Sequence, residues 1–77
     1  MLSYDDCKGI AAEKAENYGV KLSKAYTIGS DYAFDSDVEC VGVFPVVVCP
    51  ENGYCYGLWQ YVNMKDMSMD DLVEREL

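Results

Sequence analysis

The chain has 77 residues, enough for one small domain, and 51% of them are hydrophobic, a fraction too high for a disordered tail. Fourteen acids against six bases give a net charge of −8, which disfavours nucleic acids and anionic membrane surfaces as partners. The first residues lack the pattern of a secretory leader, and no apolar run approaches the roughly 20 residues of a membrane helix. We therefore expect a cytoplasmic protein whose cysteines are mostly reduced.

The N-terminal segment predicts a helix. Ser3 and Asp6 have the spacing of a capping box, and the body from Cys7 to Tyr18 is rich in Ala, Lys and Glu. Gly19 is the expected stop, because glycine readily adopts the left-handed conformation that ends helices. A stripe of side chains at helical spacing needs a sheet or helix beneath it: Cys7, Ile10, Ala11, Ala15 and Tyr18.

Two strands are expected next. Leu22 to Ile28 has strand composition, and the turn Gly29 to Asp31 leads into Tyr32 to Asp35 as an antiparallel partner. From Ser36 to Gly42 acids alternate with apolar residues, a pattern typical of a loop or an irregular sheet edge.

The clearest structural signal is a hairpin of two apolar runs. Val43 to Cys49 and Tyr54 to Tyr61 flank the turn Pro50 to Gly53. A three-residue loop of Glu51, Asn52 and Gly53 would place Cys49 opposite Cys55. Both faces of this hairpin are apolar, so each face needs cover.

The N-terminal helix provides one cover, and the tail is a candidate for the other. Ser68 and Asp71 repeat the capping-box spacing before a short apolar stripe ending at Leu77. A helix of about ten residues is marginal alone and would form only when docked. The alternative cover is a partner chain. We predict a single α+β domain over residues 1–77: the N-terminal helix on a three- to four-stranded, mainly antiparallel sheet, with a short C-terminal helix.

The residues for most catalytic and cofactor chemistry are missing. The chain has no histidine, which excludes Ser-His-Asp and Cys-His nucleophiles and imidazole catalysis. Its glycines do not form a phosphate-binding motif, and its four cysteines lack the paired spacing of zinc sites. We expect no enzymatic activity, no cofactor and no metal.

Cys49 and Cys55 form a candidate redox pair, because the predicted register places them directly across the hairpin, at a separation compatible with a disulfide. The alternative is two reduced thiols that fill space near the turn.

Candidate partner-binding residues fall into an acidic set and an aromatic set. The acidic set lies where the sequence has no Lys or Arg: Asp31, Asp35, Asp37 and Glu39. It would suit a basic protein, although negative charge also simply favours solubility. The aromatic set is Tyr54, Tyr56, Trp59 and Tyr61. Tyr and Trp are enriched at interface hot spots, but they are also ordinary strand residues.

Three motifs follow one another along the chain: Tyr32-Ala-Phe34, Gly42-Val-Phe-Pro-Val-Val-Val48 and the turn Glu51-Asn-Gly53. With the order of the predicted elements, they resemble the YrhB-like domain grouped with bacterial toxin immunity proteins. This resemblance implies a non-enzymatic cytoplasmic protein that binds and blocks a toxin. The helix-then-hairpin order is also similar to PepSY-type modules. The competing interpretations are a structural homodimerising domain and a small peptide- or ligand-binding module that uses the aromatic face.

Overall fold

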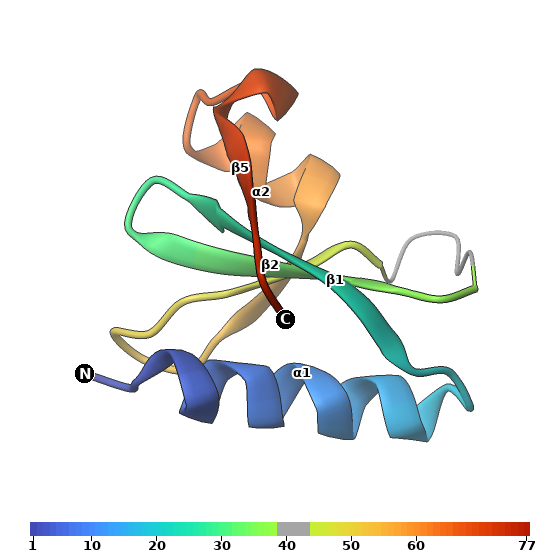
Figure 1. Ribbon diagram of the computed structural model, residues 1–77. Helices are drawn as coiled ribbons and strands as arrows, with labels where there is room; N and C mark the ends of the chain where they lie inside the picture. Colours follow the sequence, from blue (N-terminus) through green and yellow to red (C-terminus); the bar gives the residue numbers. More distant parts are fainter. Residues whose placement is uncertain (39–43) are drawn as a thin grey trace.

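The computed structural model describes residues 1–38 and 44–77, and shows one antiparallel sheet with a helix on each face (Figure 1). The sheet has five strands in the order β4-β3-β2-β1-β5. The elements are α1 (Tyr4–Asn17), β1 (Leu22–Ile28), β2 (Asp31–Ser36), β3 (Val46–Val48), β4 (Cys55–Gly57), α2 (Leu58–Met64), a single 3-10 turn (Met69–Asp71) and β5 (Leu72–Arg75). The predicted α+β class is confirmed, with one or two more strands than expected.

Helix α1 begins and ends as its sequence predicts. The Asp6 amide donates to Ser3 Oγ and the Ser3 amide donates to Asp6 Oδ2, both at 3.1 Å, so the capping box is complete. Gly19 follows the helix with a φ of +71°. Of the predicted stripe, Cys7, Ala11 and Ala15 are buried and Ile10 is half-buried. Tyr18 is 55% exposed because it is the C-cap residue, beyond the last helical turn.

The β1–β2 hairpin also confirms the sequence prediction. Ile28 pairs with Asp31 across a tight turn in which Gly29 has a φ of +61°. At the other end, the Asp37 amide donates to the Lys21 carbonyl at 2.8 Å. Residues 39–42 of the predicted irregular edge lie outside the described residues.

The β3–β4 hairpin forms, but the predicted register is wrong by one residue. Val48, not Cys49, pairs with Cys55, because the turn starts one residue earlier than predicted. The Cys49 carbonyl accepts from both Asn52 and Gly53, and the Cys49 amide donates to the Tyr54 carbonyl at 2.9 Å. Gly53 has the predicted left-handed conformation. A one-residue slip moves every β4 side chain to the other face of the sheet.

The second run of the hairpin is a strand only as far as Gly57, so the predicted strand to Tyr61 is wrong in its last four residues. Leu58 to Met64 is helix α2, and its buried residues are Leu58, Tyr61 and Val62, which lie on one helical face. This short helix, rather than the tail, covers the second face of the sheet.

The predicted tail helix is wrong beyond its first turn. The capping box of Ser68 and Asp71 is present, but Leu72 is already extended. Residues Leu72–Arg75 then pair with β1 as an edge strand. The short C-terminal helix of the predicted fold is therefore α2, and the tail adds a fifth strand.

Each face of the sheet has its own apolar core, which confirms that both faces need cover. In Figure 1, α1 lies below the sheet and α2 above it. The core on the α1 side comprises Cys7, Ala11, Ala15, Ala25, Phe34, Phe44, Val46 and Val48. The core on the α2 side comprises Ile28, Ala33, Val47, Cys49, Leu58, Tyr61 and Val62.

Candidate functional site

Three of the four predicted aromatic residues lie within one short stretch, from the end of the β3–β4 turn to the first turn of α2. Tyr56 pairs with Val47, whose side chain is in the α2-side core, so Tyr54 and Tyr56 share that face of β4 and its turn. Trp59 lies in the first turn of α2. Tyr54 is 62% exposed, Trp59 is 67% exposed and Tyr56 is half-buried. We call Tyr54, Tyr56 and Trp59 the aromatic surface.

Tyr61, the fourth aromatic candidate, is a core residue and is not accessible to a partner. It is 1% exposed, and its hydroxyl donates to the carboxylate of Asp31. Burial raises the pKa of Tyr61 well above its usual range, and the bond to Asp31 raises it further. This bond ties α2 to the start of β2, so Asp31 has a structural partner within the chain.

Two of the remaining acidic candidates, Asp35 and Asp37, accept hydrogen bonds from backbone amides of the chain. Asp35 is half-buried and its carboxylate accepts from the Ser36 amide at 2.8 Å. Asp37 is exposed and accepts from the Lys21 amide at 3.1 Å. Glu39 lies outside the described residues. Asp35 and Asp37 therefore hold the chain at the end of the β1–β2 hairpin.

Cys49 and Cys55, the predicted redox pair, are not directly opposite each other in the hairpin. Because of the register, Cys49 lies in the α2-side core and Cys55 packs against the α1-side core. Both are free thiols. Burial raises the pKa of each thiol, which lowers the thiolate fraction and hence the reactivity toward oxidants.

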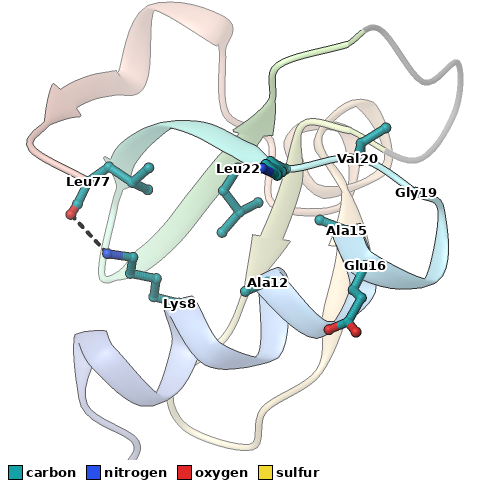
Figure 2. Close-up of a pocket in the computed structure, with 9 residues that line it drawn as sticks. Lys8, Ala12, Ala15, Glu16, Gly19, Val20, Leu22 and Leu77 are labelled. Atoms are coloured by element: carbon teal, nitrogen blue, oxygen red, sulfur yellow. Dashed lines mark hydrogen bonds between the residues drawn. The ribbon is translucent and has the colours of Figure 1, made fainter.

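A groove of about 510 Å³ opens on the α1 side, between the helix and the edge of the sheet (Figure 2). We call it the α1 groove. One wall is a single face of α1, formed by Lys8, Ala12, Ala15 and Glu16 at helical spacing. The small alanine side chains leave space that larger residues would fill.

The other wall of the α1 groove comes from two segments that are far apart in the sequence. Val20, Lys21 and Leu22 line it where the chain enters β1, and Leu77 lines it after β5. Lys8 Nζ donates to the main-chain oxygen of Leu77 at 3.1 Å and closes one end, while Glu16 lies toward the other end (Figure 2). Sequence reasoning missed this groove; its only local signal is the pair of alanines on one face of α1.

The tail is anchored beside the groove by contacts to the start of α1. The guanidinium of Arg75 lies over the Tyr4 ring, 3.7 Å from its centroid. Tyr4 also donates from its hydroxyl to the Glu76 carbonyl at 3.2 Å. These contacts hold β5 and the following residues against α1.

A scan against protein-family models, a search of curated proteins and a search of solved structures found no match to this chain. The resemblance to immunity proteins therefore stays a prediction. Within residues 1–38 and 44–77, no three His, Cys, Asp or Glu side chains gather in a way that could hold a metal ion. The helices in the same part of the chain are too short or too polar to cross a membrane.

Proposed function

We propose that this chain is a non-enzymatic protein-binding module that holds a basic protein partner against its aromatic surface. The observation that carries the proposal is the exposure of Trp59 and Tyr54, both more than 60% accessible, beside an edge strand. Tyr and Trp dominate interface hot spots because they combine a large apolar area with a polar group.

The packing of the core does not require Trp59 to be exposed. Helix α2 already buries Leu58, Tyr61 and Val62 against the sheet, so its contribution to the core is complete without Trp59. The only Trp of the chain instead lies on the solvent side of that helix. A large apolar side chain in that position gains free energy when a partner removes it from water.

Charge favours a basic partner. The net charge is −8, and exposed acids stand near the aromatic residues in the sequence, Glu51 in the turn before Tyr54 and Asp66 after α2. Such a field speeds the encounter with a positively charged protein and repels acidic ones.

Because of the resemblance to immunity proteins, we propose a toxin as the basic partner. A cytoplasmic protein that covers a basic toxin surface would block it without chemistry of its own, which agrees with the lack of histidine in the sequence. A homodimer is the second candidate, because Trp59 and Tyr54 could equally be covered by another copy. An aromatic site for a short peptide or small ligand is the third.

The test compares two variants of the aromatic surface, Trp59→Ser and Tyr54→Ser, with Tyr18→Ser as a matched control at the C-cap of α1. Tyr18 is similarly exposed, at 55%, but lies outside the aromatic surface. Proteins retained from source cells by the wild-type chain and by the control would be purified and titrated individually by calorimetry. We expect Trp59→Ser to weaken binding of a basic partner by about thirtyfold, the effect of one interface hot spot.

Light scattering on the isolated chain separates the alternatives. A monomer supports the proposal, whereas a stable dimer that Trp59→Ser dissociates would assign the aromatic surface to self-association. A purified partner that binds wild type and Trp59→Ser equally would overturn the proposed surface.

A further inference from the structure

We propose that Asn52 is a site of spontaneous covalent modification, at which the side-chain amide becomes an acid through a cyclic imide formed with the Gly53 nitrogen. The chain supplies both the electrophile and the nucleophile, and water is the co-reactant. The site lies in the turn between β3 and β4, and the inference does not depend on the proposed function.

Asn52 differs from the other two asparagines of the chain in its surroundings. All three side chains are exposed. Asn17 is the last residue of α1 and Asn63 lies in α2, and each is followed by a residue with a large side chain that crowds the next nitrogen. Asn52 lies in a turn and precedes Gly53, which has no side chain to hinder an attack by its nitrogen.

One hydrogen bond of the turn activates the side-chain carbon of Asn52. The Tyr54 amide donates to Asn52 Oδ1 at 3.0 Å, so the side chain bends back toward the main chain around the Gly53 nitrogen. When this nitrogen attacks Cγ, negative charge develops on Oδ1. A backbone amide that already points at this oxygen stabilises that charge. Because Oδ1 is the atom held by the backbone, Nδ2 is the group that leaves.

Other contacts of the turn slow the reaction. The Gly53 amide donates to the Cys49 carbonyl at 2.7 Å, and its nitrogen can attack only after this bond opens and the proton is lost. The start of α1 also holds the turn, because the Leu2 amide donates to the Pro50 carbonyl at 2.7 Å (Figure 1). A Cβ added at Gly53 would lie 3.3 Å from Leu2 Cδ1, so the two residues are packed closely. The rate is therefore set by how often the turn opens.

The atoms of the reaction balance with hydroxide and water alone. Hydroxide removes the Gly53 amide proton, the nitrogen forms a bond to Asn52 Cγ, and the bond from Cγ to Nδ2 breaks. Nδ2 takes a proton from water and leaves as ammonia. Water then opens the imide at either carbonyl, which gives an aspartyl or an isoaspartyl residue. The isoaspartyl product has an extra carbon in its main chain, which lengthens the turn and disrupts its bonds to Cys49.

Mass spectrometry of the full chain, incubated at neutral and at mildly alkaline pH, tests the site. We expect the mass gain of an amide-to-acid exchange at residue 52, in both products, at a rate that rises in proportion to the hydroxide concentration. Asn17 and Asn63 are internal controls and should keep their amides. Asn52→Gln should show no gain, because its longer side chain would have to close a larger, less favourable ring. No gain at residue 52, or an equal gain at Asn17 or Asn63, would overturn the site.

A second comparison tests the role of turn opening. Leu2→Ala removes packing that holds the turn, so we expect hydrogen exchange of the Gly53 amide and conversion of Asn52 to accelerate by the same factor. Val73→Ala, an exposed change in the strand at the end of the sheet away from β4, should alter neither rate. Circular dichroism verifies that both variants fold. Faster exchange at Gly53 without faster conversion of Asn52 would contradict the proposed dependence on turn opening.

Discussion

The hydroxyl of Tyr61 shows how one residue serves the fold in a way that its side-chain type alone does not reveal. An aromatic side chain in an apolar run can belong to an interface or to the core. Tyr61 belongs to the core, because it is almost fully buried. Its polar hydroxyl then needs a partner, because burying an unpaired hydroxyl is costly. Asp31 supplies that partner.

Removing this hydroxyl should destabilise the protein in a pH-dependent way. In Tyr61→Phe the Asp31 carboxylate loses its donor, and we expect a loss of about 1–3 kcal/mol at neutral pH. The folded-state pKa of Tyr61 is raised, so the bond contributes fully below the unfolded-state pKa of about 10. Above that pH the unfolded chain releases the proton first, and the wild-type advantage falls by up to about 1.4 kcal/mol per pH unit.

Urea denaturation of wild type and Tyr61→Phe between pH of about 8 and about 11 measures this difference. Other groups with raised pKa values, among them Tyr4 and Cys7, lower the alkaline stability of both proteins equally and cancel in the comparison. The exposed Tyr18→Phe serves as the control. Parallel stability curves for wild type and Tyr61→Phe would contradict the assigned bond.

At the scale of the element, local signals predicted α1, β1 and β2 well. A capping box and a glycine turn act within a few residues, so their outcome does not depend on the rest of the chain. Helix α2 was missed because its aromatic residues also suit a strand. The spacing of Leu58, Tyr61 and Val62 was the helical signal, and Gly57 marks the change from strand to helix.

The tail and the α1 groove could not be predicted in this way. The capping box at Ser68 does start a turn, but the open edge of β1 competes for the following residues, and strand pairing wins over a marginal helix. The groove joins residues from α1, the entry to β1 and the end of the chain, which only the topology brings together. The sequence singled out Tyr54, Trp59 and Tyr61 together, and it did not reveal that Tyr61 is buried while the other two are exposed.

Edge strand β5 should open more readily when its anchor on α1 is removed. Arg75→Gln loses the cation–π contact with Tyr4, worth about 0.5–1 kcal/mol at an exposed site. We expect amide hydrogen exchange in β5 to rise about two- to fivefold, with little change in β2 and β3, because β5 contacts only β1 in the sheet. Lys24→Gln, an exposed change in β1, is the control. A uniform increase across all strands would show that β5 opens only with the whole sheet.

At the scale of the whole molecule, the two-sided cover separates two surfaces. The sheet separates the α1 groove from the aromatic surface, so residues of one can be substituted without a direct contact with the other. Both lie on a body only 31 × 27 × 21 Å across that carries a net charge of −8. Every surface charge therefore acts on the whole molecule at low salt.

Because like charges repel one another, we expect the stability of the fold to rise as salt is added. At about 0.01 M salt the screening length is about 30 Å, comparable to the longest dimension of the molecule, so its acids repel one another throughout. At about 0.5 M the screening length is only a few ångströms. Relief of about 1 kcal/mol of repulsion would raise the melting temperature by roughly 4–8 °C in a domain of this size.

The double variant Glu13→Gln and Glu51→Gln tests whether repulsion is the cause, since both side chains are exposed, Glu13 on α1 and Glu51 in the β3–β4 turn. It should melt higher than wild type in low salt and gain less from added sodium chloride, because two of the repelling charges are gone. Circular dichroism melts at both salt concentrations measure the two gains. A melting temperature that falls with salt would mean that favourable charge pairs outweigh the net repulsion, and it would also remove the long-range field on which the attraction of a basic partner depends.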